Sequence, residues 1–421
     1  MGGTIPGYRG SNAGFLLLLF SAAGLAQSSW DAQSSWDAGA RLSDSIAAAS
    51  DNRLKITLES RGRYERRTGN AFGRDPDLDT GLIRTRLGLS FTPVRWLKLS
   101  AMVQDSRAPW YGPNAPNTVR DPADLHEGYV ELFPDSKTGF GMTAGRMMLN
   151  YGDGRLIGTP QWGNLARTYD HARLYYRSAR ARIELLLVSP VKVRIGEFNR
   201  PDLSDRVWGL YDSFPDIYGK NLLEVYALRH ERASDNLRRN TLGFRAAGPL
   251  PSDSRYVLAA AAQNQGKALA ATISRRWSPC GKPLDISGEY KYASPAFDQL
   301  YPANHDKFGH EDLFGWRNLH NLRSLTVLGL TRPLAVNFMY DSYWLASLKD
   351  GLYNGSGKLI GRPTLAGGRR VGQETDLFAT YRYRHFLFGA GWGHLFAGAY
   401  LRRATPGVGP TYLYVFHTYS L

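Results

Sequence analysis

From Leu54 onward, short segments of the chain alternate apolar and polar residues in strict order. In the segment 54–65, Leu54 and Ile56 alternate with Lys55 and Thr57. Successive side chains of a β-strand point to opposite faces, so each such segment predicts a strand with one apolar and one polar face. We expect further strands near residues 83–91, 97–104, 125–133, 140–148, 168–177, 181–189, 223–230, 240–247, 256–265, 269–277, 284–292, 323–332, 334–343, 376–384, 387–396 and 411–421, with others between 343 and 370.

Three features of these segments favour a membrane barrel over a soluble β-sandwich, which would also alternate. Their polar faces carry paired arginines, aromatic residues gather at their ends, and tight turns alternate with long polar linkers such as 104–123, 190–220 and 293–322. These are the marks of transmembrane barrels with short periplasmic turns and long outer loops. We therefore expect an all-β fold in which residues 53–421 form a single transmembrane antiparallel β-barrel of about 16–18 strands.

The N-terminus has the form of a secretory signal. An apolar run from Phe15 to Phe20 follows Arg9 and ends at Ala26, and it is shorter than the roughly 18 residues that a spanning helix needs. A buried helix or a membrane anchor is the alternative. We expect residues 1–26 to be a signal peptide cleaved near Ala26, 27–52 to be a flexible periplasmic leader, and the mature chain to reside in the outer membrane of a Gram-negative-type bacterium.

Arginine dominates the basic residues. The formal charge is +15, and 41 of the 52 basic residues are arginine against 11 lysines. The planar guanidinium fork suits carboxylate or phosphate better than the lysine point charge does, which predicts an anion-handling surface. An exported chain without zinc spacing, a basic helix or an RNA-binding motif is not expected to bind nucleic acid.

Several arginines stand two residues apart, which places both on one face of a strand. Facing lipid, each would cost about 2–4 kcal/mol at the middle of the membrane, so we expect them to line the lumen, where rings of basic residues select anions. The alternative is that they serve only structure, in a plugged barrel. The pairs are Arg61 and Arg63, Arg84 and Arg86, Arg180 and Arg182, and Arg382 and Arg384; Glu59, Glu65, Glu184, Glu374 and Asp376 are expected to pair with some of them.

Three blocks of the sequence resemble the alginate export family. They are 145–173, 301–322 and 393–407, and the likeness extends over roughly residues 50–421. The resemblance implies an outer-membrane barrel whose arginine-rich pore conducts a polyanionic uronate polymer out of the periplasm. Met147 and Met148 stand where the family pattern has polar residues, and the chain is shorter than the alginate exporters proper. The family positions are Gly145, Tyr151, Gly152, Trp162, Asp170 and Trp316, and the resemblance places Arg146, Arg155, Arg167 and Arg173 at or near the pore.

No motif in the sequence predicts catalysis, a metal or a cofactor. Asp75, Asp77 and Asp79 lack the glycine and glutamate of a calcium loop, and the cluster around His305 and His310 has no standard zinc spacing. Nucleophile elbows, His-Glu-x-x-His helices and phosphate-binding loops are also missing. We therefore expect a channel and not an enzyme, although a lumenal enzyme assembled from distant strands remains an alternative.

The leading functional hypothesis is an anion-selective outer-membrane channel for an acidic polysaccharide or oligosaccharide. The alternative is a general or anion-selective porin that takes up small acidic solutes. Expected partners are the transported anion, outer-membrane lipid and the barrel-assembly machinery. The predicted pore-lining residues are Arg61, Arg63, Arg84, Arg86, Arg146, Arg155, Arg167, Arg173, Arg182, Arg317, Arg382 and Arg384.

Overall fold

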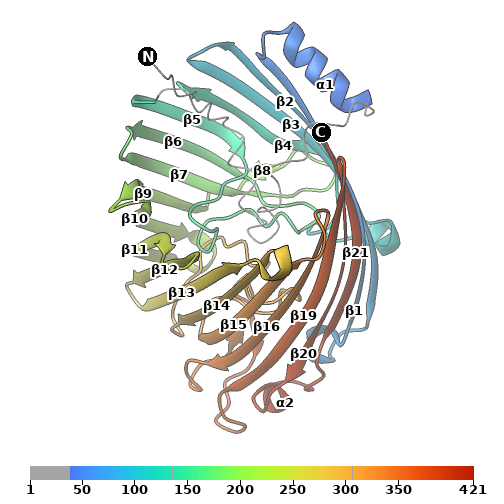
Figure 1. Ribbon diagram of the computed structural model, residues 1–421. Coiled ribbons are helices and arrows are strands. Elements are labelled where there is room, and N and C mark those ends of the chain that lie inside the picture. Colours follow the sequence, from blue (N-terminus) through green and yellow to red (C-terminus); the bar gives the residue numbers. More distant parts are fainter. Residues whose placement is uncertain (1–37, 135–136, 306) are drawn as a thin grey trace.

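The computed structural model describes residues 38–134, 137–305 and 307–421, and these form a barrel of long antiparallel strands (Figure 1). The expected signal peptide, 1–26, lies outside the described residues, as does the first part of the expected leader. The spanning strands are β1 (Leu54–Thr68), β2 (Leu78–Val94), β3 (Leu97–Arg107), β4 (Asp121–Leu132), β5 (Gly139–Met147), β6 (Tyr169–Arg177), β7 (Arg182–Lys192), β9 (Asp205–Ile217), β10 (Asn221–Arg232), β11 (Leu237–Leu250), β12 (Ser254–Gln263), β13 (Gly266–Trp277), β14 (Leu284–Ala293), β15 (Leu319–Gly329), β16 (Leu334–Leu345), β19 (Arg370–Tyr383), β20 (Phe386–Ala397) and β21 (Thr411–Ser420).

These eighteen strands close into one sheet, which confirms the predicted fold class. Each strand pairs with its neighbours in chain order, and the last strand, β21, pairs with β1 in the register Gly62↔His417. Closure leaves no unpaired sheet edge, the condition that lipid imposes on a spanning sheet. Among the described residues, no helix is both long and apolar enough to cross a membrane.

The two faces of the wall follow the predicted alternation. In β2, Leu87 and Leu89 are exposed on the outer surface, whereas Arg84 and Arg86 are buried inside. Directly opposite residues on neighbouring strands share a face, so the pairs Leu58↔Leu87 and Glu59↔Arg86 place β1 in the same alternation. The apolar outer surface fits a lipid environment, and the polar residues are turned to the lumen.

Turns and loops segregate to the two ends of the barrel. Short turns join β2 to β3, β9 to β10 and β19 to β20, and both ends of the strand series lie on that side. Most connections at the opposite end are longer, including 148–168, 294–318 and 346–369. Short turns are periplasmic and long loops extracellular in bacterial barrels, which orients the chain. The short helix α1 (Ala38–Ala49) lies beside the wall, where the Ser43 hydroxyl donates to the Ile56 carbonyl oxygen.

One detail of the strand prediction was wrong, because the stretch 190–220, expected to be a loop, contains β9. The further strands expected between 343 and 370 are present as a small separate hairpin, β17 (Leu352–Tyr353) and β18 (Leu359–Gly361). β9 escaped detection because both its faces are apolar: Val207 and Tyr211 are buried inside, while Trp208 and Leu210 are exposed outside.

Two long loops fold back into the lumen and pack against each other. We call 148–168 loop A and 294–318 loop B. A parallel bridge joins Ile157 of loop A to Tyr301 of loop B, and Phe297 and Trp316 belong to the same buried apolar cluster. The lumen is therefore narrowed by ordered chain. The remaining elements are β8 (Arg200–Pro201), α2 (Leu401–Ala404), η4 (Asn70–Phe72), η5 (Pro109–Asn114), η6 (Ala233–Asp235) and η7 (Pro279–Gly281).

Candidate pore constriction

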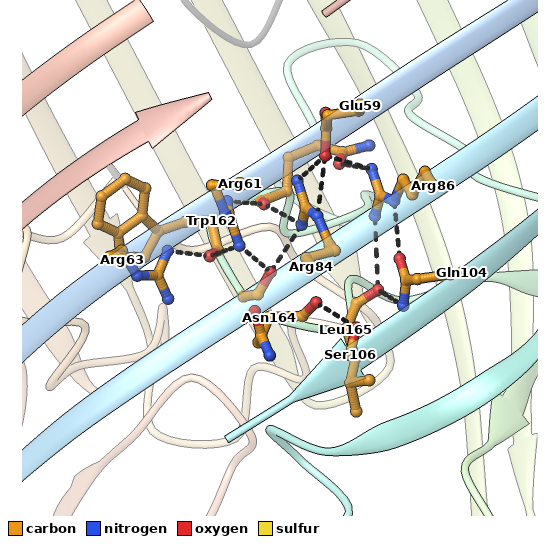
Figure 2. Close-up of polar contacts among 12 residues, drawn as sticks. Glu59, Arg61, Arg63, Arg84, Arg86, Gln104, Ser106, Trp162, Asn164 and Leu165 are labelled. Carbon is orange, nitrogen blue, oxygen red and sulfur yellow. Dashed lines mark hydrogen bonds and ion pairs between the residues drawn. The ribbon is translucent and has the colours of Figure 1, made fainter. Parts of the chain in front are cut away.

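Four lumenal arginines, Arg61, Arg63, Arg84 and Arg86, form what we call the arginine ladder, and they bind the backbone of loop A (Figure 2). Arg61 donates to the carbonyl oxygens of residues 161, 162 and 163 at 2.9–3.0 Å. Arg84 donates to those of residues 161 and 163, and Arg63 donates to the Trp162 carbonyl at 2.5 Å. Inside a barrel these carbonyls have no sheet partner, and a buried carbonyl left unpaired is costly. The ladder supplies the missing donors.

Two carboxylates, those of Glu59 and Glu65, balance part of the positive charge of the arginine ladder. Arg84 and Arg61 lie directly opposite on β2 and β1, and Glu59 accepts two hydrogen bonds from Arg84, at 2.9 and 2.7 Å. Arg63 pairs with Glu65 at 2.6 Å. All four arginines are at most 6% exposed, so most of their donors serve the protein itself. The prediction that they face the lumen agrees with this geometry, and their visible role is to hold loop A.

Arg86 and Asn164 complete the attachment of loop A. Arg86 donates to the side-chain oxygens of Gln104 and Gln161. The side-chain amide of Asn164 donates to three backbone carbonyls, including that of Val119 at 2.8 Å, and the backbone carbonyl of Asn164 accepts from the Ser106 hydroxyl. Loop A is thereby fixed along β1 to β3.

Trp162 joins loop A to loop B. Its indole N–H donates to the Tyr412 hydroxyl at 3.1 Å, and its ring stacks on His305 of loop B with a centroid distance of 4.7 Å and an angle of 2°. The Arg63 guanidinium lies 4.1 Å from the centroid of the Trp162 ring. The two loops and the ladder thus meet at one tryptophan.

The predicted pore arginines of loop A are also engaged. Arg155 binds Asp153 and Glu289 and lies over the ring of Trp316. Burial opposes its charge, but the two carboxylates raise the pKa of Arg155 above its ordinary value. Arg167 donates to the Pro302 carbonyl of loop B. Both side chains therefore cross-link the constriction.

On β6 and β7, Arg173 and Arg182 share Glu184, with separations of 3.9 and 2.5 Å. Tyr151 of loop A also donates to Glu184. Gly152 has φ +59, and a Cβ there would lie 3.1 Å from the Tyr211 hydroxyl. The glycine lets loop A approach the wall closely at this family position.

Arg146 is placed differently from the other predicted pore residues. It pairs with Gly128 of β4 and Asp170 of β6, and it lies on the same face of β5 as the outward-facing Met142. Its guanidinium binds the Asp170 carboxylate at 2.7 Å and donates to the backbone carbonyls of Leu125 and Asn199. The preceding Gly145 has φ +125, and a Cβ there would meet the Gly128 carbonyl at 2.3 Å. The geometry favours a structural role for Arg146, which holds neighbouring parts of the barrel wall together.

The last three predicted arginines lie at the edges of the lumen. Arg317, at the base of loop B, donates to the Pro295 carbonyl and lies 3.8 Å from the centroid of the Tyr353 ring. Arg384 lies in the short turn after β19 with φ +53. Arg382 is exposed, two residues after a lumenal position of β19.

A set of free cations surrounds the periplasmic mouth. We call Lys55, Arg255 and Arg382 the rim cations: each is exposed, and each shares a strand face with lumenal residues such as Glu59, Ala259 and Asp376. Their side chains form no hydrogen bond or ion pair with any residue that the structure describes. Arg255 was not among the predicted pore residues, because it belongs neither to a pair of arginines two residues apart nor to one of the three family blocks.

The expected pairing of carboxylates with arginines was right for Glu59, Glu65 and Glu184 and wrong for two others. Glu374 accepts instead from the Glu311 backbone N–H at 3.0 Å and from the Tyr343 hydroxyl at 3.3 Å. Both oxygens of Asp376 are buried without a hydrogen-bond partner. In the described part of the chain, no cluster of His, Cys, Asp or Glu has the geometry to hold a metal ion.

Comparisons with known proteins agree with this architecture. Residues 52–294 and 291–414 match the family described as alginate export. Curated proteins give no match. Among solved structures, Pseudomonas aeruginosa OccK11 (OpdR) is similar at a TM-score of 0.60 and 12% identity, over 87% of this chain and 96% of that one. OccK1 (OpdK) from the same organism is similar at a TM-score of 0.61 and 10% identity, over 87% of this chain and 98% of that one. A structure of OpdK with vanillate is similar at a TM-score of 0.60 and 10% identity, with the same coverage.

Proposed function

The chain belongs to the alginate export family, and from that premise we propose that it conducts an acidic, uronate-type polysaccharide or oligosaccharide. As a member of this family the chain is an outer-membrane channel of a Gram-negative bacterium and not an enzyme. The identity of the solute and the preference for anions are the proposed part.

The observation that carries the proposal is the division of the lumenal cations into two groups. The arginine ladder is buried and committed to loop A, whereas the rim cations are exposed and unpaired at the periplasmic mouth. Free guanidinium and ammonium groups attract carboxylates and leave them free to move on. A polyanion arriving from the periplasm would meet this charge first, which supports outward transport.

Within the predicted pore set, we assign contact with the solute to Arg382 and the half-buried Arg182, near the periplasmic ends of β19 and β7, and to the half-buried Arg173 further along β6. The arginine ladder, Arg155 and Arg167 would shape the constriction by fixing loops A and B. This division supports an anion pore in which most arginines position the loops and only a few meet the solute.

Uptake of small acidic solutes is the second candidate. Its support is the fold likeness to OpdK, which has been solved with vanillate, a small carboxylate. Loops A and B narrow the lumen, and a narrow passage suits a small acid as well as a single extended polymer chain.

Neutralising the rim cations is expected to lower the preference for anions. We expect the triple substitution Lys55→Gln, Arg255→Gln and Arg382→Gln to reduce the anion-to-cation permeability ratio by about threefold or more, since the exposed lumenal charge falls by three. Reversal potentials in planar bilayers measure the ratio. The matched control is Arg66→Gln, Arg206→Gln and Arg229→Gln, which removes the same charge from outward-facing positions and should leave the ratio unchanged.

Oligouronate separates the two candidates, and salt tests the preference for anions that they share. The preference for anions should weaken between 0.1 and 1 M salt, because the screening length falls from about 10 to 3 Å. Oligouronate added on the periplasmic side should block the current if the polymer is the solute. Cation preference in the unmodified protein would contradict both candidates, and block by monomeric acids alone would favour uptake of small solutes.

We also propose that the first 26 residues are removed on export and that the barrel-assembly machinery then inserts the barrel. The apolar run 15–20 behind Arg9 motivates this. N-terminal sequencing of the protein extracted from outer membranes is expected to start at Gln27. A retained Met1 would contradict the cleavage.

A further inference from the structure

A short part of loop B, Lys307–Asp312, presses against the inner wall formed by β19, β20 and β21. Phe308 is buried beside Lys291, whose ammonium donates to the Lys307 carbonyl. His310 lies over the ring of Phe378 at 4.3 Å and bonds the Tyr414 hydroxyl. We call this part the docked segment.

The docked segment places a carboxyl group against two others. Glu311 lies beside Glu374 and Asp376 of β19, and the three are 3%, 0% and 1% exposed. The Glu311 backbone N–H donates to Glu374. One oxygen of Glu311 and both oxygens of Asp376 are buried without any hydrogen-bond partner among the described residues. Three carboxyls buried together cannot all be ionised unless cations compensate them.

The cations that face this cluster are already committed to other groups. Arg323 of β15 binds Asp341 of β16 through both carboxylate oxygens at 3.0 Å. Arg67 of β1 donates to the Glu311 backbone carbonyl, and its Nε lies 3.5 Å from Glu65.

The other titratable groups around the cluster add no positive charge to it. The phenols of Tyr343, Tyr412 and Tyr414 face it from β16 and β21. His394 of β20 lies on the outer face between Trp392 and Phe396 and bonds the Thr411 hydroxyl. Within loop B, burial lowers the pKa of His310 well below its ordinary value, and His305 pairs with Asp312. The Lys291 ammonium lies on Glu289 and the Lys307 carbonyl.

The flanks of the docked segment are fixed independently. Ala303 donates its backbone N–H to the Gly154 carbonyl, and Gly158 donates to the Tyr301 carbonyl, both at 2.9 Å. On the other side, Gly315 donates to the Tyr353 carbonyl at 2.9 Å. The segment can therefore leave the wall while loop B remains attached at both ends.

We propose that the docked segment is a pH-dependent gate, which stays on the wall while the Glu311, Glu374 and Asp376 cluster holds protons and leaves it as the cluster ionises. Loop B starts from β14 and β15 and reaches β19 and β21 through the docked segment, so its release opens a passage between loop B and that part of the wall. The gate would make the channel more open in neutral than in acidic surroundings. This inference goes beyond the proposed function and does not depend on the identity of the solute.

The direction of the effect follows from proton binding. Burial raises the pKa of Glu311 from 4.5 to about 7, although Arg67 opposes the rise. Between these values the docked state holds a proton that the released state has lost, so docking weakens as the pH rises. Each pH unit in that window shifts the ratio of docked to released protein by up to about tenfold. Below 4.5 both states are protonated and docking is at its strongest.

The test is the single-channel conductance in potassium chloride between pH 4.5 and 8, which needs no uronate. We expect the conductance or the open fraction to rise across this range in the native protein. Glu311→Gln, which keeps the shape but cannot ionise, should keep the channel in its acidic state and remove most of the rise. Glu197→Gln, an exposed carboxyl on another loop, is the matched control and should retain the native pH profile.

Hydrogen exchange gives a second readout that does not require a conducting pore. After correction for the intrinsic pH dependence, amides 307–312 should lose protection above pH 7 in the native protein and keep it in Glu311→Gln. A flat native conductance and equal protection at pH 4.5 and 8 would overturn the proposal, as would a Glu311→Gln protein with the native pH profile. An absence of anion preference would instead count against the proposed function alone.

Discussion

Replacing Arg84 by methionine is expected to raise the single-channel conductance severalfold. The substitution removes two hydrogen bonds to the backbone of loop A and leaves Glu59 without its closest cation. Breaking a buried ion pair on one side costs about 3–5 kcal/mol, which weakens the attachment of loop A by a factor of about 10 or more if half of that cost falls on docking. Conductance in planar bilayers measures the widening, and hydrogen exchange of amides 161–165 measures the release.

The control for this experiment lies on the neighbouring strand. Arg66 of β1 pairs with Asp79 at 3.1 Å, with both side chains about half exposed, and exposed pairs contribute about 0–1 kcal/mol. Arg66→Met should therefore leave conductance and exchange close to native. Equal effects of the two substitutions would mean that the ladder arginines do not hold the constriction.

The sequence predicted the barrel well because a closed membrane sheet leaves its pattern in every strand. Lipid on one side and a polar lumen on the other impose the alternation that Leu87 and Arg86 illustrate. β9 broke the rule because its inner residues, Val207 and Tyr211, face the apolar cluster of the inner loops and not water. A strand with two apolar faces carries no period of two.

The candidate site was predicted in part, and the missing part is long-range. Alternation correctly placed Arg61 and Arg84 in the lumen, but their partners are the carbonyls of residues about 80–100 positions away. Backbone carbonyls are present at every residue, so no local sequence pattern could indicate that the arginine ladder binds loop A. Arg146 departs from the expected location because it lies on the same side of β5 as the outward-facing Met142, so the alternation of that strand places it on the outer face.

The partners of the carboxyls in the acidic cluster of Glu311, Glu374 and Asp376 were also beyond what the sequence pattern could predict. Glu374 and Asp376 sit among arginines in the sequence pattern, and pairing with them was the natural prediction. The structure instead gives Arg323 to Asp341 and turns Glu374 and Asp376 toward Glu311 of loop B. Which carboxylate receives a counter-ion depends on how the loop folds back, and the period of the strands holds no information about that.

Substituting Gly309 by alanine is expected to expel the docked segment at every pH. Gly309 has φ +83, and a Cβ there would lie 2.0 Å from a Glu374 oxygen, in a wall position that cannot retreat far because Tyr343 also binds that carboxyl. Gly357, in the β17–β18 hairpin, has φ +79, but a Cβ added there would meet nothing within 4 Å. Both alanines cost about 1–2 kcal/mol for the left-handed backbone, so Gly357→Ala measures that strain alone.

The Gly309→Ala channel should show the high conductance of the neutral state already at pH 4.5, together with exposed amides at 307–312, whereas Gly357→Ala should keep the native pH profile. If Gly309→Ala also keeps that profile, the docked segment does not control the pore.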